Sequence, residues 1–365
     1  MNITVEKNIF QKSILTVSNA VSTKSTMPIL ANILLEAKSG QLRCAATDLE
    51  VGVECEIQAT VNNEGGIAIP AKKISDIVRE LPDAPVAIST ENNIAKVTCE
   101  KTAFTLSGMP REDFPQIPLF PKTESFEISQ SLLKDMIKKT MFAVSTEELR
   151  YALNGIFFQT KDKELRLVAT DGRRLSMIKN EIDIKLKEKL GVIIPNKAIQ
   201  ELNLILGDEG NISIACSANQ IFFKTDNITL SSRLIDGQFP NYEQVIPSKC
   251  DKKVLLKTDR FLQSLRRVSI LASEKSNSIK FSLEPNTITI SANTPELGEA
   301  RDEFDVDYSG EKLQVAYNGK YVMDVLKNLG SEDTQLELNQ PLSPGVFRPA
   351  KDDNYTNVIM PIKLT

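Results

Sequence analysis

The stretch VATDGRRLS brings one aspartate and two arginines together within a few positions. A carboxylate such as Asp171 can act as a general base, and neighbouring arginines such as Arg173 and Arg174 can clamp a phosphate. A second stretch, AATDLEV at 45–51, repeats the Ala-Thr-Asp core with Asp48 in the equivalent place. The pattern is compatible with acid–base chemistry at two places, or with a structural turn that the chain uses more than once.

The composition counts against most enzyme chemistry. The sequence contains no histidine, which removes the commonest general base and the commonest metal ligand. Ser-His and Cys-His nucleophile systems are therefore excluded. Neither GxGxxG nor GxxxxGK[ST] occurs, so the two common phosphate-binding loops are not predicted. The five cysteines are scattered without a CxxC pair, and we expect them to be reduced.

The length and the hydropathy pattern describe an ordinary globular chain. A chain of 365 residues suggests two or three domains. No apolar run approaches the ~20 residues of a membrane span. The first residues, MNITVEKNIFQKS, lack the basic start and apolar core of a signal peptide. We therefore expect a cytoplasmic protein with no membrane contact.

Internal repetition is the main organising feature. Ala46 and Ala169 are the first residues of the two ATD cores. The same sequence separation counted on from Ala169 ends at Ala292, where the chain reads ANTPE. Other markers recur with it. A first helix is predicted at 7–22, 129–145 and 257–271; a strand at 29–37, 153–160 and 278–284; and a second helix at 69–82, 194–206 and 317–329. A hairpin is predicted at 96–108.

These repeats predict an α+β fold of three similar domains, each with two helices and antiparallel sheets. We place the domains at 1–120, 121–248 and 249–365. The predicted helices are basic as a group: the one at 7–22 carries lysines and no acidic residue. Since the net charge is −4, the rest of the chain is acidic. A basic helical surface could follow a phosphate backbone without recognising bases, although single basic helix faces are commonly only solvated.

The chain resembles the bacterial DNA polymerase III beta subunits, the sliding clamps, over its whole length. The motifs that carry the resemblance are TMPILANILLEA, AATDLEVGVE, IPAKKISDIVRELP, RYALNGIFF, VATDGRRLS, LIDGQFPNYEQVIP, DYSGEKLQVAYNGKYVMDVL and YTNVIMPIKL. The resemblance implies a DNA clamp fold in which two protomers join head to tail, and helices line the hole of the ring. Such a ring encircles double-stranded DNA without sequence specificity.

The resemblance also implies a role in DNA replication as a processivity factor. The partners would be the replicative polymerase, the clamp loader and other proteins with a clamp-binding motif. The resemblance implies no catalytic residues, no metal site and no cofactor.

The resemblance implies three sets of site residues. DNA-binding positions are Lys24, Lys72, Glu147, Tyr151 and Ala152. The partner-peptide pocket would use Leu153, Thr170, Gly172, Arg173, Arg174, Leu175, Pro240, Val245, Leu342, Pro344, Val358, Ile359, Met360, Pro361 and Ile362. The dimer interface would join Phe104 and Leu106 to Ile270 and Leu271 of the partner protomer.

Two other functions compete with the clamp. An enzyme would use Asp48 and Asp171 as general bases, but a catalytic site is rarely repeated in equivalent units. A sequence-specific DNA reader would need a recognition-helix motif and a basic overall charge, and the sequence has neither.

Overall fold

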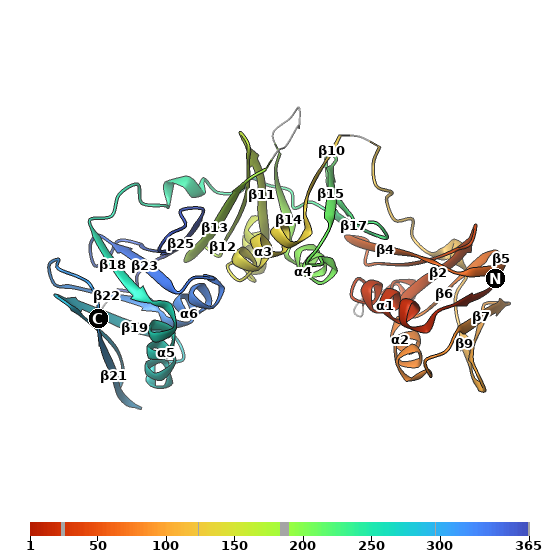
Figure 1. Ribbon diagram of the computed structural model, residues 1–365, viewed down its shortest axis with the longest axis horizontal. Coiled ribbons are helices and arrows are strands. Elements are labelled where there is room, and N and C mark those ends of the chain that lie inside the picture. The colour runs from red at the N-terminus through yellow and green to blue at the C-terminus, as the bar shows by residue number, and fades with distance from the viewer. Residues whose placement is uncertain (23–25, 123, 183–189, 296, 364–365) are drawn as a thin grey trace. The chain divides into compact units, whose positions relative to one another are not determined.

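The computed structural model describes residues 1–22, 26–122, 124–182, 190–295 and 297–363 (Figure 1). Within these ranges the chain forms two compact units. Unit 1 holds residues 1–134 and 197–234, and unit 2 holds residues 135–182, 190–196 and 235–363. The division passes through the middle repeat.

The described residues form six α-helices, two in each repeat. They are α1 (Lys7–Ser18), α2 (Ala71–Glu80), α3 (Gln130–Met141), α4 (Asn196–Ile205), α5 (Thr258–Val268) and α6 (Gly319–Asn328). In α1 the buried side chains of Phe10, Ile14 and Val17 recur at helical spacing and face the sheet. Each helix is shorter than its sequence pattern predicts. The chain leaves α1 after Ser18 and turns back, and the backbone N–H of Ser22 bonds to the carbonyl of Leu30.

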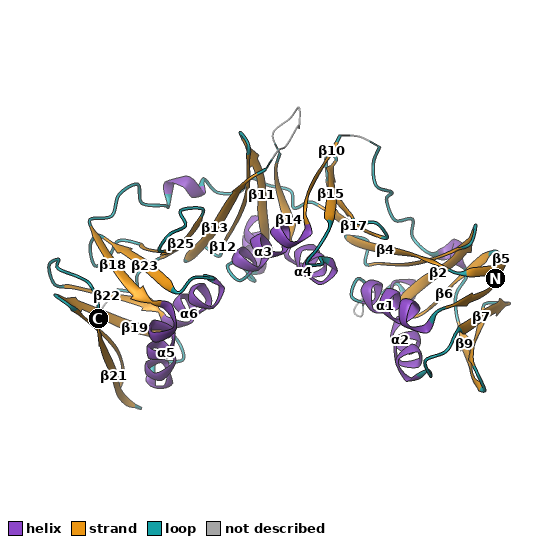
Figure 2. Ribbon diagram, viewed as in Figure 1, coloured by secondary structure: helices purple, strands orange, loops and turns teal. Residues whose placement is uncertain are grey.

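Unit 1 contains two antiparallel sheets. One has the order β5-β1-β7-β8-β9, with β1 (Asn2–Val5), β5 (Thr60–Asn63), β7 (Val86–Glu91), β8 (Ile94–Cys99) and β9 (Thr102–Ser107). The other has the order β10-β15-β16-β17-β4-β3-β2-β6, with β2 (Asn32–Lys38), β3 (Gln41–Thr47), β4 (Val51–Gln58), β6 (Gly65–Pro70), β10 (Ser125–Ser129), β15 (Asn211–Cys216), β16 (Gln220–Lys224) and β17 (Ile228–Arg233). Helices α1 and α2 lie side by side in this unit (Figure 2).

Unit 2 also contains two antiparallel sheets. One has the order β14-β11-β12-β13-β25-β24-β23-β18, with β11 (Gly155–Lys161), β12 (Glu164–Thr170), β13 (Arg174–Glu181), β14 (Gly191–Pro195), β18 (Lys252–Lys257), β23 (Asp333–Leu338), β24 (Gly345–Pro349) and β25 (Tyr355–Ile359). The other has the order β21-β20-β19-β22, with β19 (Ser278–Glu284), β20 (Thr287–Thr294), β21 (Gly298–Asp305) and β22 (Leu313–Asn318). Helices α5 and α6 pack against each other here (Figure 2).

The predicted repeat is visible in three equivalent hairpins. The ATD-type stretches end β3, β12 and β20, and the next strand of each hairpin, β4, β13 or β21, follows after a short turn. The degenerate copy at Ala292 therefore occupies the same structural place as the other two. The hairpin predicted at 96–108 is formed by β8 and β9.

Two predicted strands begin later than expected. The segments at 29–37 and 153–160 start in the 3-10 turns η1 (Pro28–Ala31) and η3 (Glu148–Leu153), and only then continue as β2 and β11. In η1, Pro28 occupies the first helical turn, which its fixed φ favours. The apolar pattern alone did not distinguish these turns from strand.

The described residues offer neither a membrane-spanning helix nor a cluster of metal ligands. None of their helices combines the length and the apolar character that a membrane crossing requires. They also bring together no group of three His, Cys, Asp or Glu side chains that could hold a metal ion.

Candidate partner-binding site

The turn between β12 and β13 is built by the side chains of Thr170 and Asp171. Thr170 Oγ1 donates to the carbonyl of Arg174 at 2.6 Å and accepts the N–H of Gly172 at 3.0 Å. Asp171 Oδ1 accepts the N–H groups of Arg173 at 2.9 Å and Arg174 at 3.0 Å. This is the local side-chain-to-backbone bonding that makes Asp and Thr frequent in turns.

The turn between β3 and β4 repeats this bonding. Thr47 Oγ1 donates to the carbonyl of Val51 at 2.9 Å and accepts the N–H of Leu49 at 3.0 Å. Asp48 Oδ1 accepts the N–H groups of Glu50 at 3.0 Å and Val51 at 2.7 Å. The two aspartates that could have been catalytic bases thus perform the same structural task in both turns.

The two arginines of the second turn differ in their surroundings. The Arg174 guanidinium bonds to Asp171, to Asp324 and to the carbonyl of Phe142, and its side chain is only 11% exposed. Arg173 is exposed to solvent. A phosphate clamp made by both arginines is therefore not favoured, because the donors of Arg174 are already occupied.

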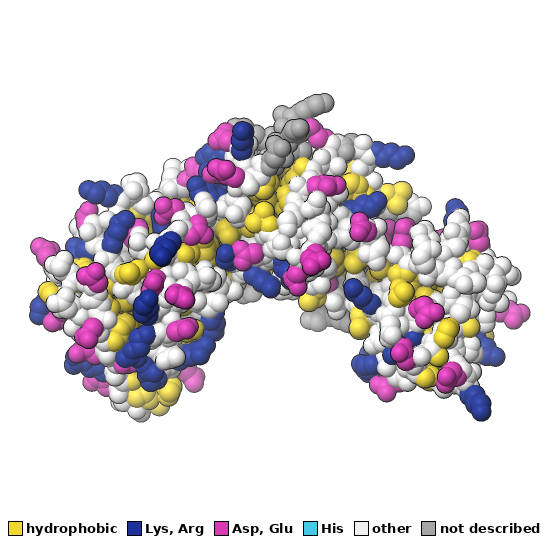
Figure 3. Space-filling model, in the orientation of Figure 1, with side chains coloured by type: hydrophobic (Ala, Val, Ile, Leu, Met, Phe, Trp, Pro, Cys, Tyr) yellow, Lys and Arg dark blue, Asp and Glu magenta, His cyan; other side chains and the backbone are white. Residues whose placement is uncertain are grey.

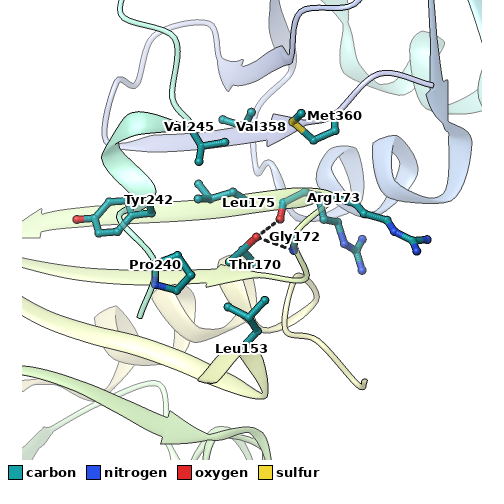
Figure 4. Close-up of a pocket in the computed structure, with 11 residues that line it drawn as sticks. Leu153, Thr170, Gly172, Arg173, Leu175, Pro240, Tyr242, Val245, Val358 and Met360 are labelled. Carbon is teal, nitrogen blue, oxygen red and sulfur yellow. Dashed lines mark hydrogen bonds between the residues drawn. The ribbon is translucent and has the colours of Figure 1, made fainter. Parts of the chain in front are cut away.

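A groove opens beside this turn in unit 2, with a volume of about 130 Å³. The residues that line it are mainly apolar and come from η3, β12, β13, β25 and the loop before β18: Leu153, Thr170, Gly172, Arg173, Arg174, Leu175, Pro240, Tyr242, Val245, Val358 and Met360. In Figure 4 the Leu175 side chain lies between Val245 and Val358 on one side and Pro240 and Leu153 on the other.

The residues at the floor of the groove are buried, whereas those at its edge are exposed. Leu175 and Val358 are buried and belong to one apolar cluster with Tyr242 and Phe239. By contrast, Met360 and Val245 remain 41% and 42% exposed at the edge. A small apolar opening with flexible methionine at its rim is suited to a few side chains of an extended peptide.

Most of the pocket residues that the resemblance implied are brought together here. The exceptions are Leu342, Pro344, Ile359, Pro361 and Ile362, which are not among the lining residues. Ile359 is fully buried on the opposite face of β25 from Val358, as the alternation of a strand requires. Ile362 N–H bonds to the Ala316 carbonyl at 2.7 Å, so the chain beyond β25 turns toward β22.

Two residues at the groove were not predicted from the sequence. Tyr242 lines it between the predicted Pro240 and Val245, and its hydroxyl donates to Gln159 Oε1 at 2.9 Å. Arg150 covers the turn at its rim, where its Nη1 donates to the Asp171 carbonyl at 2.7 Å. Tyr242 could have been found from its place between two predicted lining residues; no sequence signal indicated the Arg150 contact.

Sequence profiles of the DNA polymerase III beta subunit match three consecutive segments of the chain. The N-terminal domain matches residues 1–118, the central domain 127–241 and the C-terminal domain 243–363. The chain belongs to the DNA polymerase III beta subunit family. It has the three-domain clamp fold of this family, with mixed helices and antiparallel sheets.

Relatives of this beta subunit family match the chain over its full length. The beta sliding clamp of Pseudomonas putida is 35% identical, and the alignment covers 100% of both chains. The beta sliding clamp of Staphylococcus aureus is 32% identical over 100% of this chain and 99% of its own. The crystal structure of the DNA polymerase III subunit beta from Pseudomonas aeruginosa has a TM-score of 0.96, with 34% identity and 100% coverage of both chains.

The DNA-binding positions that the resemblance implies fall at several places. Lys24 lies outside the described residues. Lys72 is exposed on α2 in unit 1. In unit 2, Tyr151 is 58% exposed, Ala152 is half-buried, and the exposed Glu147 is paired with Arg150 at 3.2 Å. Lys72 and Tyr151 have the exposure that a contact with DNA requires.

The implied dimer contacts of the family lie at two sheet edges. Phe104 and Leu106 are half-buried on β9, the last strand of its sheet in unit 1. Ile270, 76% exposed, and the half-buried Leu271 form the end of η5 (Ser269–Leu271) in unit 2, beside the edge strand β21. Both edges present apolar side chains.

Proposed function

We propose that two copies of this chain, a DNA sliding clamp by family, close head to tail into a ring around double-stranded DNA. The match of three consecutive beta subunit domains over the whole chain carries this proposal. The domains would span 1–120, 121–248 and 249–365. The ring has no catalytic task and needs no cofactor: it tethers other proteins to DNA. It works in the cytoplasm, where bacterial DNA is replicated.

Ring closure is supported by the edges of the two terminal sheets. β9 ends one sheet of unit 1 and β21 ends one sheet of unit 2. An edge strand offers unpaired N–H and C=O groups to another chain. Phe104 and Leu106 on one edge, against Ile270 and Leu271 beside the other, would add apolar contact. Such a head-to-tail interface is heterologous, and it must close by rotation to avoid a filament.

The groove beside the second ATD turn is proposed as the site for partner peptides. Its buried floor of Leu175 and Val358 and its exposed edge of Met360 and Val245 suit apolar side chains of an extended segment. The replicative polymerase, the clamp loader and other proteins with a clamp-binding motif would compete for it. Leu342, Pro344, Ile359, Pro361 and Ile362 stay in the proposal only as neighbours of the groove.

Contact with DNA is supported by the charge of the helices. In Figure 3, Lys and Arg side chains gather around α5 in unit 2. Arg260 and Arg267 of this helix share the single carboxylate of Asp302, and Arg266 is exposed. Partial neutralisation favours weak contacts with phosphates, which sliding requires, since each firm phosphate contact raises the affinity and its dependence on salt. Lys24, Lys72, Glu147, Tyr151 and Ala152 remain the proposed DNA-facing positions.

The decisive experiment compares binding to circular and to linear DNA. The protein is loaded on nicked circular DNA by its clamp loader, and its retention during gel filtration is compared before and after a restriction enzyme cuts the circle. A ring that encloses DNA stays on the circle and leaves the linear molecule by sliding off its ends. Equal retention on both forms would refute the enclosing ring, and would favour a conventional DNA-binding protein.

A further inference from the structure

The guanidinium of Arg174 is held by acceptors from three directions within unit 2. Nε lies 3.1 Å from Asp171 Oδ2, Nη1 donates to Asp324 Oδ2 at 2.8 Å, and Nη2 donates to the Phe142 carbonyl at 2.5 Å. Its Cζ also lies 4.3 Å from the centre of the Tyr321 ring. Because a guanidinium is planar and its donors are fixed in direction, this set of contacts determines where the side chain sits.

Arg174 is also one of the residues that line the groove. It precedes Leu175, whose side chain forms the floor. Arg174 lies opposite Ile359 and Leu175 opposite Val358 in the pairing of β13 with β25. A change in the position of the Arg174 side chain would therefore move the floor residue next to it.

Asp324 is the ion-pair partner that the third repeat supplies to Arg174. It lies on α6, its side chain is 34% exposed, and it does not line the groove. Lys327 Nζ is 4.0 Å from its other carboxylate oxygen, a weaker contact than the one with Arg174. Its ion pair with Arg174 therefore links Asp324 to a residue that does line the groove.

The first repeat shows what the turn looks like without this arginine. Val51 stands where Arg174 stands in the second turn, and Asp48 pairs instead with Lys197 of α4 at 2.5 Å. Both turns thus carry an ion pair to a helix, but only the turn beside the groove places an arginine in the strand itself. Of these two turns, the arginine and its partner on a helix therefore occur only in the one that lies beside the groove.

We propose that Asp324 is a positioning residue for the partner groove: through Arg174 it holds the β13 end of the floor in the shape that accepts a peptide. The proposal rests on the groove being the partner site. It makes the affinity for partners depend on a helix residue that does not line the groove.

The test measures binding of the full-length protein to the purified catalytic subunit of DNA polymerase III from the same bacterium. Asp324→Asn is expected to weaken binding about three- to tenfold, since coupling through a packed network is of this order. Asp324→Glu should retain most of the affinity. Lys327→Gln is the matched control: it removes the other neighbour of Asp324 on the same helix, and should leave the affinity unchanged.

A double variant tests the route through Arg174. In an Arg174→Lys background, Asp324→Asn should cause little further loss, because the three directed hydrogen bonds of the guanidinium and its contact with the Tyr321 ring are already gone. An equal further loss would overturn the proposal, as would unchanged affinity of Asp324→Asn alone. Val245→Glu, at the exposed edge of the groove, separates the two proposals. If both Asp324→Asn and Val245→Glu leave polymerase binding intact, the groove is not the partner site. If Val245→Glu abolishes polymerase binding while Asp324→Asn leaves it intact, only the positioning role of Asp324 is overturned.

Discussion

The carboxylate of Asp171 lies 3.1 Å from the guanidinium of Arg174 while it also accepts two backbone N–H groups of its own turn. Asp48 has the same backbone bonds and pairs with Lys197. An aspartate whose oxygens are committed to the backbone and to a cation stabilises a turn. The repeated ATD core is therefore explained by folding.

Removing either carboxylate should reduce stability. Asp171→Ala and Asp48→Ala each lose two backbone bonds and an ion pair, and we expect the free energy of unfolding to fall by roughly 1–3 kcal/mol in each case. Asparagine keeps the oxygen that accepts the N–H groups, so Asp171→Asn and Asp48→Asn should lose less. Urea unfolding followed by circular dichroism measures the series. Alanine variants as stable as the parent chain would contradict the structural role.

The central residues of the two turns give a matched pair. Gly172 has φ +84°, and a Cβ there would collide with the guanidinium of Arg150. Leu49 occupies the equivalent place with φ 79° and already carries a side chain there. Gly172→Ala should therefore lower the free energy of unfolding by about 1 kcal/mol or more. Leu49→Gly should be nearly neutral or slightly stabilising, since it relieves the strained φ.

The same pair also tests the groove. Gly172→Ala displaces Arg150 from the Asp171 carbonyl at the groove rim, so polymerase binding should weaken along with stability. Leu49→Gly lies in unit 1 and should leave polymerase binding unchanged. A loss of binding in Leu49→Gly alone would contradict the placement of the partner site.

The repeat made much of the fold predictable. The spacing of Ala46, Ala169 and Ala292 predicted three equivalent positions, each of which lies at the turn end of a hairpin, and the repeated helical patterns predicted the six helices of the described residues. These features are local or periodic, and a sequence displays both. Helix ends were less well predicted because tertiary bonds, such as Ser22 to Leu30, decide where the chain leaves the helix.

The groove was predictable only in part. The positions carried by the VATDGRRLS motif and by Val358 and Met360 came together as expected. Arg150 and Asp324 could not be inferred, because their roles depend on side chains that meet across separate elements. Ile359, which the resemblance placed in the pocket, is buried and does not line the groove, since successive residues of a strand face opposite sides.

The salt dependence of DNA binding tests the role of Lys72. This lysine is exposed on α2, and a contact between it and a phosphate would release about one counterion. In Lys72→Gln, the slope of log affinity against log salt for a short duplex should decrease in magnitude by about 0.9. Fluorescence anisotropy at several salt concentrations measures it. Lys38→Gln, at the exposed end of β2, is the control and should keep the parent slope; an unchanged slope in Lys72→Gln would exclude the contact.

Acid should weaken unit 2 through Asp302. The hydrogen bonds from Arg260, and then those from Arg267, hold the pKa of this carboxyl well below its usual range. Since the folded pKa lies below the unfolded value of about 3.9, the stabilisation is fully present at neutral pH and is lost as the pH falls below about 4. Both arginines are partly exposed, so we expect about 1 kcal/mol rather than the full value of the shift.

Asp302→Asn makes this measurable. At pH 7 its free energy of unfolding should be lower than that of the parent chain by this amount. The difference should shrink as the pH is lowered from 5 toward 3, because Asp302 of the unfolded parent chain then takes up a proton, which stabilises the unfolded state relative to the folded one. Asp305→Asn, exposed on the same strand β21, is the matched control and should show little difference at any pH. The opposite result is a difference in the free energy of unfolding between Asp302→Asn and the parent chain that stays constant down to pH 3. That result would mean that packing, rather than the charge on Asp302, holds β21 against α5.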